Sequence, residues 1–391
     1  MNSTDRTLSP WAEIDEGTWQ SWTWQLRNAL HTASELNAAI ASDRSLTVGP
    51  TLLPRKPTIN GFEFKVTPHM VVALQSALAN NVSGAWDAFT ACFVPTDNER
   101  LRISDGSSDD RIGEEEPIAN PVAAISSFYH DRALFRVTHM CPAYCRYCFR
   151  RRMVGDGEGA WNRREIEEGL SFLARTPTVK EVILSGGDPL ILSDDRLRYV
   201  VESLRAIPHV RRLRIDTKAL TMLPQRITAN LVAILASVKP FYVIGHFTHP
   251  YELTNEVLDA CARLVDNGIV VGSHTPMLRG VTDNADVLCD LFERLVDHRV
   301  LPYYLIHFIP TPWTEHFRVP LEHAIEIVRD VQARCGGLSV PAFIVYLPDA
   351  GGKVVVSPDY LVKKVSSGFV FRSHDGREIL YPENLGSRDS S

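Results

Sequence analysis

The sequence predicts an α/β protein in which a partial barrel of six strand–helix units follows a helical N-terminal region and precedes a small C-terminal β-hairpin. Three observations lead to this prediction. Short apolar runs alternate with amphipathic segments from residue 133 to residue 347. Bulky residues recur at helical spacing in two segments before residue 80. Near the end of the chain, an Asp-Gly pair, which favours a tight turn, separates two β-rich runs.

Residues 1–125 form the predicted helical region. The segments TWQSWTWQLRNAL (18–30) and TPHMVVALQSALA (67–79) place bulky side chains three or four residues apart, as an amphipathic helix does. The stretch NERLRISDGSSDDRIGEEEP (98–117) is polar and contains glycines. We therefore expect an exposed loop there.

Residues 126–352 form the predicted barrel. Its apolar runs are ALFRVT, EVILSG, VRRLRID, FYVIGHF, GIVVGSH, LPYYLIHF and PAFIVYL, and an amphipathic segment lies between each pair. Strand-then-helix alternation predicts a parallel sheet with the helices outside. Barrels of this kind carry their functional groups at the carboxyl ends of the strands. The remaining residues, 353–391, contain a glycine-flanked lysine and the predicted hairpin GFVFRSHDGREILYPE.

The bulk composition limits the classes of function. The formal net charge is -6, which argues against a nucleic-acid-binding protein, because such proteins usually carry a basic excess. No apolar run reaches the roughly 20 residues that a membrane span needs. The first residues, MNSTDRTLSPWAEIDEG, are polar and contain no signal-peptide core. We expect a cytoplasmic enzyme with no membrane partner and no disulfide framework.

Three of the seven cysteines lie close together in CPAYCRYCFRRR. Cys141, Cys145 and Cys148 are spaced C-x3-C-x2-C, directly after the first apolar run. A structural zinc site needs four ligands, and no second cysteine pair is present. Three thiolates can instead hold an iron–sulfur cubane with one iron open to a small ligand. The spacing therefore favours an iron–sulfur cluster, with zinc and incidental thiols as the alternatives.

This spacing, with Tyr147 before the last cysteine, resembles the signature of radical S-adenosylmethionine enzymes. LSGGDPL (184–190), at the end of the second run, is similar to the Gly-Gly-Glu/Asp motif of the same superfamily. The resemblance implies a [4Fe-4S] cluster held by the three cysteines. It also implies that S-adenosylmethionine contacts Gly186, Gly187 and Asp188.

The segment YLPDAGGKVVV places Lys353 after two glycines. Taken alone, this lysine fits a surface residue, a phosphate-binding charge or a Schiff-base lysine for pyridoxal phosphate. From about residue 19 to residue 383, however, the chain resembles the lysine 2,3-aminomutase family, which uses both cofactors. The matching segments are WQSWTWQLRN, YHDRALFRVTHMCPAYCRYCFRRR, LSGGDPL, LPQRIT, HFTHPYE, LRGVTD, PYYLIHF, EHFRVPLEHAIEI and the lysine loop.

The family resemblance assigns further residues. Lys353 matches the lysine that forms the Schiff base with pyridoxal 5'-phosphate and is therefore expected to be catalytic. Tyr129 and Arg132 match positions that hold the phosphate and ring of that cofactor. Arg150 matches the position that pairs with the substrate carboxylate, a role suited to a planar guanidinium. His274 replaces a glutamine near S-adenosylmethionine. Of the two arginines after Arg150, we expect at least one to be solvated.

The resemblance is interrupted at the substrate side chain. The lysine enzymes of the family hold the substrate ammonium with two aspartates, and those positions are Ile309 and Tyr346 here. Burying an unpaired ammonium is costly, which disfavours lysine as the substrate. An apolar or aromatic wall suits a neutral or aromatic side chain, or arginine with Asp349 as a displaced counter-charge. The zinc-binding cysteines that some relatives carry near the C-terminus are missing, so we expect no structural zinc.

The resemblance implies an isomerase that moves the α-amino group of an L-α-amino acid to C3 and yields a β-amino acid. It further implies a protein electron donor such as flavodoxin or ferredoxin, and a homo-oligomer. The alternatives are L-lysine 2,3-aminomutase itself, an epimerase or eliminase with the same cofactors, and, more remotely, a zinc-stabilised nucleic-acid-binding module.

Overall fold

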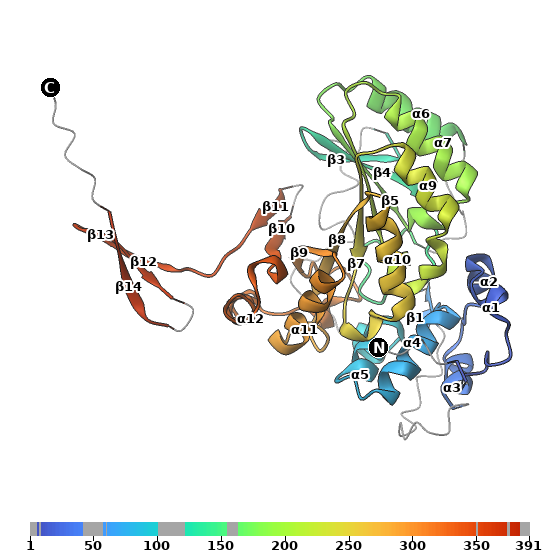
Figure 1. Cartoon of the computed structure of the whole chain (residues 1–391), viewed down its shortest axis with the longest axis horizontal. Coiled ribbons are helices and arrows are strands. Elements are labelled where there is room, and N and C mark those ends of the chain that lie inside the picture. The colour runs from blue at the N-terminus through green and yellow to red at the C-terminus, as the bar shows by residue number, and fades with distance from the viewer. Residues whose placement is uncertain are drawn as a thin grey trace.

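The core of the protein is an open nine-stranded sheet curved into a partial barrel (Figure 1). The computed structural model describes residues 6–7, 9–41, 58–59, 61–100, 122–154, 163–348, 351–373 and 376–383. The strand order is β11-β10-β9-β8-β7-β6-β5-β4-β3. Strands β4 to β10 run parallel, whereas β3 and β11 pair antiparallel at the two edges. The predicted barrel of six strand–helix units is confirmed, with a seventh parallel strand completing the last unit.

The strands of this sheet are β3 (Ile125–Tyr129), β4 (Arg132–Thr138), β5 (Glu181–Gly186), β6 (Arg212–Thr217), β7 (Phe241–His246), β8 (Val270–Met277), β9 (Leu301–His307), β10 (Ala342–Leu347) and β11 (Gly352–Val355). Every second residue of these strands points toward the outer helices. The apolar ones among them, such as Val182, Leu213 and Val243, belong to the main hydrophobic core. Because side chains alternate between the two faces of a strand, the positions between them face the barrel interior.

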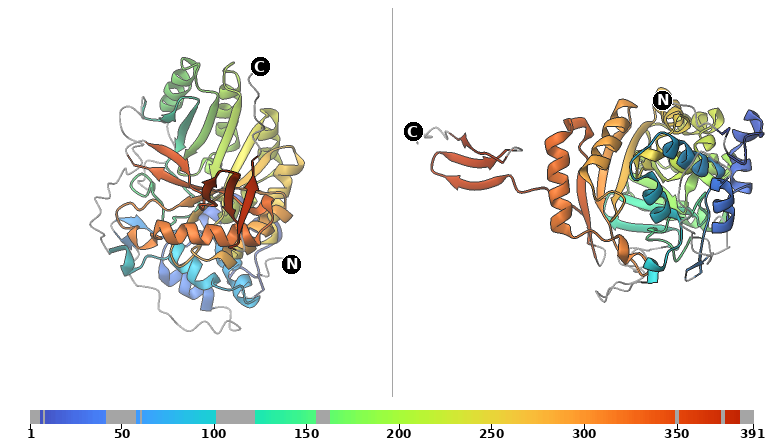
Figure 2. Two further views of the ribbon diagram at one scale, coloured as in Figure 1. Left: turned by 90° about the vertical axis from the view of Figure 1, so that its left-hand side faces the viewer. Right: turned by 90° about the horizontal axis from the view of Figure 1, so that it is seen from below.

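The helices that connect successive strands pack on the outside of the sheet (Figure 2). They are α6 (Arg163–Ala174), α7 (Asp194–Arg205), α8 (Ala219–Met222), α9 (Ala229–Ser237), α10 (Asn255–Asp266), α11 (Ala285–Asp297) and α12 (Leu321–Arg334). Side-chain caps define several of their starts. Ser193, Thr228 and Thr254 each accept a hydrogen bond from a backbone N–H of the first turn, which satisfies a donor that the helix leaves unpaired.

The N-terminal region covers the carboxyl ends of the barrel strands. It contains α1 (Glu16–Trp19), α2 (Trp22–Arg27), α3 (Ala33–Ala41), α4 (Pro68–Ala79), α5 (Ala85–Phe93), the short strands β1 (Thr58–Ile59) and β2 (Phe62–Glu63), and the 3-10 turn η1 (Asp97–Arg100). Side chains of α3, α4 and α5 share one apolar cluster with Tyr147, Met222, Tyr251 and Phe317, which follow four different strands. The predicted helical region therefore forms the cover over the end of the barrel where the cysteines lie.

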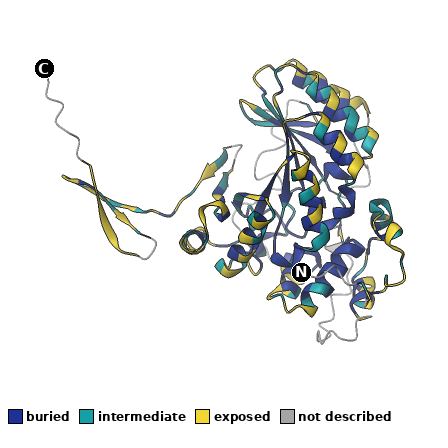
Figure 3. Ribbon diagram, viewed as in Figure 1, coloured by how far each residue is buried: buried dark blue, intermediate teal, exposed yellow. Residues whose placement is uncertain are grey.

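The C-terminal segment forms a separate three-stranded antiparallel sheet that projects from the body (Figures 1 and 2). It consists of β12 (Leu361–Val365), β13 (Gly368–Arg372) and β14 (Glu378–Pro382), and β13 and β14 form the predicted hairpin. Most of its residues are exposed (Figure 3). Lys353 lies before this sheet on β11, so the boundary expected ahead of Lys353 falls inside a strand of the barrel sheet.

All seven cysteines are free. The sulfurs of Cys289 on α11 and Cys335 after α12 are 2.8 Å apart, although they are 46 residues apart in sequence. Among the described residues, no helix is both long enough and apolar enough to span a membrane.

Candidate active site

The three clustered cysteines lie on the loop after β4, at the covered end of the barrel. Cys141 and Cys148 pack against a small apolar cluster that contains Phe62, while Cys145 packs against the core of the N-terminal region. Burial raises the pKa of all three thiols, that of Cys145 to about 12. The other two cysteines contribute to the raised pKa of Cys141, so the three thiols are electrostatic neighbours.

The donor set fits an iron–sulfur cluster, because thiolates are the ligands that hold such clusters. In the part of the chain that the structure describes, however, no group of three His, Cys, Asp or Glu side chains is arranged to hold a metal ion. That result concerns a single ion, whereas the three thiolates of a cubane cluster each bind a different iron and need not converge on one point. The nearby His139 directs its Nδ1 to the carbonyl of Met153 at 3.2 Å.

The glycine pair after β5 is required by close backbone contact with the start of the cysteine loop. Gly187 N–H donates to the carbonyl of Thr138 at 2.6 Å, and Asp188 N–H donates to that of Met140 at 2.8 Å. Gly186 has a φ of +119°, and a Cβ there would lie 2.3 Å from the Thr138 carbonyl oxygen. The motif thus joins two strand ends.

Replacing Gly187 by alanine should shift the cysteine loop. Its Cβ would lie 2.2 Å from the Met140 carbonyl oxygen, and the backbone must move to make room. We expect a loss of about 1–3 kcal/mol in the free energy of unfolding, measured by urea titration, and reduced iron retention after reconstitution. Gly336→Ala is the control, because that glycine has open space around it. Equal stability of the two variants would contradict the close contact.

Asp188 is engaged by the protein itself. Its carboxylate accepts hydrogen bonds from the Thr217 hydroxyl at 2.8 and 2.9 Å, from the backbone N–H groups of Lys218 and Ala219 at 2.8 and 2.9 Å, and from Leu190 N–H at 3.1 Å. Burial raises its pKa, with the side chain 2% exposed. These contacts tie the end of β5 to the end of β6 and the start of α8. A contact of Asp188 with S-adenosylmethionine stays a prediction.

The residues predicted to hold pyridoxal phosphate meet across the opening of the barrel. The Lys353 backbone N–H donates to the Tyr129 hydroxyl at 2.7 Å, and the Arg132 guanidinium lies 4.1 Å from the centre of the Tyr129 ring. Tyr129 ends β3 and Lys353 lies on β11, so this hydrogen bond joins the two edge strands of the sheet. Gly352 has a φ of +77°, and a Cβ there would lie 3.1 Å from the Tyr129 hydroxyl, which explains the glycine before the lysine.

The Lys353 side chain is half-buried, and its amine lies among aromatic groups. Its Nζ lies 5.1 Å from the Tyr304 ring centre and 5.0 Å from that of Tyr346. Tyr346 is the register partner of Lys353 across the β10–β11 pair, so both side chains point to the same face. Burial lowers the pKa of Lys353, and the positive charge of Arg214 lowers it further. A buried amine with a lowered pKa is poised to act as a nucleophile.

Other polar residues of the interior were missed by the sequence reasoning. Arg214 donates from Nε and Nη2 to the two carboxylate oxygens of Asp216 at 2.8 and 3.1 Å. The pKa of His246 is lowered to about 4 by burial, with Asp216 opposing and the cations Arg150 and Lys353 among the groups that add to the shift. The alternation of polar and apolar residues in VRRLRID could have revealed these residues. Leu213 and Ile215 face outward, so Arg214 and Asp216 must face inward.

His274 lies inside the barrel, 4% exposed. Its ring stacks on Tyr303 and Tyr304 at centre distances of 5.6 and 5.5 Å and lies 5.6 Å from the ring of His246. Burial lowers its pKa well below the usual value, so the ring is neutral. The Nε2 atom is buried without a hydrogen-bond partner. Such an atom fits a position that a bound cofactor or substrate completes.

Arg150 is buried at the end of β5, where its Nη1 donates to the Ser185 hydroxyl at 3.0 Å. The next two arginines behave differently from the expected solvated loop end. Arg151 is ion-paired with the buried Glu99, and Arg152 is half-buried with its Nη1 3.2 Å from the carbonyl of Phe149. Of the substrate-side positions, Tyr346 lies beside Lys353, while Ile309 is half-buried just beyond β9. Asp349 lies outside the described residues.

The chain is similar in sequence to proteins of known families. The family model "Radical SAM superfamily" matches residues 135–292, and the model "Lysine-2,3-aminomutase" matches residues 328–389. The L-lysine 2,3-aminomutase of Fusobacterium nucleatum is 34% identical over 98% of this chain and 88% of its own length. That of Clostridium subterminale is 32% identical over 97% and 88%. The glutamate 2,3-aminomutase of Clostridioides difficile is 30% identical over 93% and 83%.

Radical SAM enzymes carry a [4Fe-4S] cluster and S-adenosylmethionine, and aminomutases are isomerases. The likeness extends over nearly the whole chain and includes both the cysteine loop and the C-terminal segment. The protein is therefore an isomerase of the lysine 2,3-aminomutase family, within the radical SAM superfamily.

Proposed function

We propose that the protein is a pyridoxal-phosphate-dependent amino acid 2,3-aminomutase that moves the α-amino group of an L-α-amino acid to C3. The observation that carries this proposal is the environment of Lys353. Its ε-amine is buried inside the barrel between Tyr304 and Tyr346, its pKa is lowered, and its backbone is held by Tyr129. A surface lysine needs none of these features.

Three groups of residues would hold the cofactors. Cys141, Cys145 and Cys148 would hold the cluster, and the backbone of 186–188 with the unpartnered Nε2 of His274 would contact S-adenosylmethionine. The lysine, with Tyr129 and Arg132, would hold pyridoxal phosphate. When bound, the cluster and S-adenosylmethionine supply a hydrogen-abstracting organic radical, and pyridoxal phosphate supplies the carbonyl carbon that binds the migrating nitrogen.

The chain itself contributes an amine, a carboxylate anchor and exclusion of water. Because its pKa is lowered, the Lys353 amine is neutral over a wider pH range than an ordinary lysine. Arg150 offers a buried guanidinium near the end of β5, and His246 feels the charges of both Arg150 and Lys353. The N-terminal region covers this end of the barrel. A radical reaction benefits from such a cover, because water and other side reactants are kept out.

We further propose that the substrate side chain is neutral, aromatic or that of arginine, rather than that of lysine. The position of Tyr346 next to Lys353, on the same face of the sheet, supports a contact of this residue with the substrate side chain. A phenol ring there offers no negative charge to a substrate ammonium. The nearby carboxylate of Asp216 is already paired with Arg214.

Replacing Arg150 by lysine should lower kcat/KM for the amino acid substrate by at least about tenfold, because an ammonium cannot bind a carboxylate bidentately. The measurement is steady-state kinetics of the reconstituted enzyme. Arg152→Lys, on the same loop, is the matched control and should change kcat/KM little. Equal effects of the two substitutions would remove the assignment of Arg150 to the carboxylate.

The function is tested by anaerobic reconstitution with iron, sulfide, S-adenosylmethionine, pyridoxal phosphate and a reductant, followed by a screen of the common amino acids. We expect one amino acid to yield a β-amino acid. A product that keeps the nitrogen on C2 and carries deuterium from heavy water would indicate an epimerase, and release of ammonia would indicate an eliminase. Failure of every amino acid to yield a β-amino acid would sink the proposal.

The physiological context is proposed from the family resemblance. A one-electron donor protein such as flavodoxin or ferredoxin would reduce the cluster in the cytoplasm. A homo-oligomer is supported by the projecting C-terminal sheet, which exposes Leu361, Phe371, Ile379, Leu380 and Tyr381. Light scattering of the purified chain measures the oligomeric state directly.

A further inference from the structure

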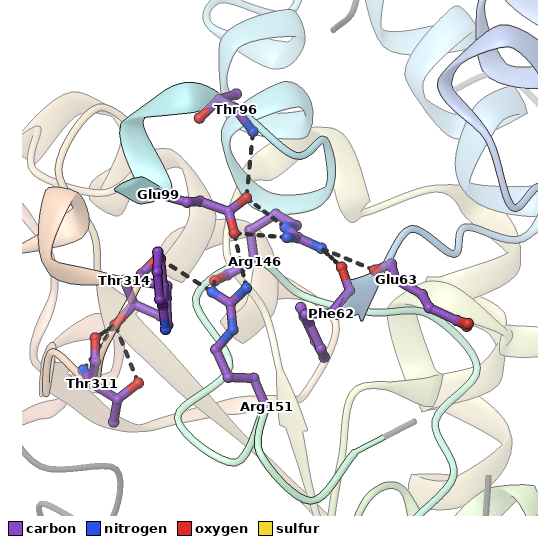
Figure 4. Close-up of polar contacts among 9 residues, drawn as sticks. Phe62, Glu63, Thr96, Glu99, Arg146, Arg151, Thr311 and Thr314 are labelled. Atoms are coloured by element: carbon purple, nitrogen blue, oxygen red, sulfur yellow. Dashed lines mark hydrogen bonds and ion pairs between the residues drawn. The ribbon is translucent and has the colours of Figure 1, made fainter. Parts of the chain in front are cut away.

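A buried carboxylate joins the N-terminal region to the cysteine loop (Figure 4). Glu99, on η1, is 0% exposed. Its Oε1 accepts from Arg146 Nε at 2.7 Å, and its Oε2 accepts from Arg146 Nη2 at 2.7 Å and from Arg151 Nη2 at 2.9 Å. Glu99 belongs to the stretch 98–117 that was expected to be an exposed loop, and that expectation is wrong for this residue because its two partners enclose it. We call Glu99, Arg146 and Arg151 the clasp.

The two arginines of the clasp lie on either side of Cys148 in the sequence. Arg146 lies between Cys145 and Cys148, and Arg151 follows Cys148 by three residues. The Arg146 backbone N–H also donates to the carbonyl of Cys92 on α5 at 2.7 Å. The loop is therefore pinned to the N-terminal region at positions on both sides of Cys148.

The clasp also contacts the cysteines' apolar surroundings. Both guanidiniums lie over the ring of Phe62, at 4.8 Å for Arg146 and 4.6 Å for Arg151. The same phenylalanine belongs to the apolar cluster against which Cys141 and Cys148 pack. A movement of either arginine would therefore be transmitted to the side chains next to two of the thiols.

Arg151 extends the clasp to the loop after β9. Its Nη1 donates to the carbonyl of Trp313 at 3.2 Å and to that of Arg146 at 3.3 Å. Trp313 has a φ of +75°, a strained conformation for a tryptophan. The turn around it is closed by Thr311 N–H donating to the Thr314 hydroxyl at 2.8 Å. This turn follows Ile309, one of the proposed substrate-side residues, so Arg151 touches both the cysteine loop and the substrate-side loop.

A contribution to the stability of the fold does not explain well why the charges of Glu99, Arg146 and Arg151 are buried. Replacing a buried ion-pair group with well-packed apolar residues is often neutral or stabilising, whereas removing one partner is strongly unfavourable. Two guanidiniums share one carboxylate here, and carbonyl oxygens of Phe62, Glu63 and Trp313 accept the remaining donors. Every partner has a fixed direction, so the arrangement specifies one conformation of the loop.

We propose that Glu99 is a positioning residue: through Arg146 and Arg151 it holds the cysteine loop in a fixed place relative to the Trp313 turn. The proposal rests on the proposed function only for the identity of what the loop binds. The placement of the loop itself is a property of the chain.

The test compares Glu99→Gln with Glu181→Gln. Glu181 is a matched control, because it also bridges two guanidiniums, those of Arg212 and Arg214, but at the start of β5, away from the cysteine loop. Hydrogen exchange is measured by mass spectrometry on the full-length protein under anaerobic conditions, with and without reconstituted cluster. The release of iron to a chelator is followed in parallel.

We expect Glu99→Gln to accelerate exchange in residues 139–154 and 308–317 by at least about tenfold, with α10 unchanged, and to accelerate iron release. Glu181→Gln should accelerate neither the hydrogen exchange of these two segments nor the release of iron. If Glu99→Gln does not fold, Arg151→Met replaces it as the test variant, because it keeps the Glu99–Arg146 ion pair. Arg151→Met should accelerate hydrogen exchange in residues 308–317. A second substitution, Arg151→Met added to Glu99→Gln, should restore part of the protection in residues 139–154, because it removes one of the two guanidiniums left without a carboxylate.

Unchanged exchange in residues 139–154, or equal acceleration by the Glu181 control, would overturn the proposal. The exchange measurement on cluster-free protein separates this proposal from the proposed function. A chain that never binds a cluster but shows the local acceleration disproves the function and leaves the clasp standing. A chain that binds the cluster but shows no accelerated exchange in the Glu99→Gln variant disproves the role of the clasp and leaves the proposed function standing.

Discussion

Replacing Lys353 by alanine should abolish covalent attachment of pyridoxal phosphate and lower the isomerase activity by at least about a hundredfold. The reason is positional: a hydrogen bond to Tyr129 holds the backbone of residue 353, and the amine lies next to the rings of Tyr304 and Tyr346. Attachment is measured by borohydride reduction followed by peptide mass spectrometry. In the unmodified protein the label should be found on residue 353.

The pH dependence of this labelling follows from the lowered pKa. A group with a lowered pKa keeps its neutral form to lower pH, so labelling of Lys353 should persist below the pH at which an exposed lysine becomes unreactive. Lys353→Arg keeps the positive charge but not the nucleophile and should also lose the label. Lys363→Ala, on the exposed strand β12, is the control and should keep it. Labelling of the Lys353→Ala variant at wild-type level would refute the two-cofactor function.

Replacing Asp188 by alanine should destabilise the barrel by roughly 3–5 kcal/mol, because it leaves several buried N–H donors without an acceptor. The donors are the backbone N–H groups of Leu190, Lys218 and Ala219. Chemical denaturation monitored by circular dichroism measures the loss. The effect should appear in protein that has never been exposed to S-adenosylmethionine, because the contacts are internal to the chain.

Asp195→Ala provides the comparison for Asp188. Asp195 is an exposed carboxylate in the first turn of α7, where its interaction with the helix dipole contributes at most about 1 kcal/mol. A loss in Asp188→Ala as small as that of the control would show that the hydrogen bonds are dispensable. In that case binding of S-adenosylmethionine would be the main reason for the aspartate.

The sequence was a reliable guide wherever the signal is local. Strand–helix alternation from residue 133 predicts the order and parallel pairing of β4 to β10, because each amphipathic segment must cover the strands it connects. The spacing of Cys141, Cys145 and Cys148 places three thiols on one loop whatever the rest of the chain does. The glycine before Lys353 is explained by the left-handed backbone that the structure shows at Gly352.

The tertiary structure decided how polar residues are used. Asp188 belongs to a recognisable motif, yet its hydrogen bonds go to β6 and α8, about 30 residues further along the chain. Arg151 looked like part of a solvated basic run, and its burial depends on Glu99, 52 residues earlier. No periodic pattern links such residues, because charged side chains are buried only where a partner compensates them, and partners are brought together by folding.

Local patterns along the chain were enough to predict the barrel, the cysteine loop, the family and the glycine-flanked lysine. Folding alone brings β3 and β11 together through Tyr129 and Lys353, places the N-terminal region over the barrel mouth, and pairs Glu99 with two arginines of the cysteine loop. The physical reason is the range of the interactions. Periodicity and turn chemistry act over a few residues and are written in the sequence locally, whereas buried hydrogen bonds and ion pairs join distant residues and exist only when the chain is folded.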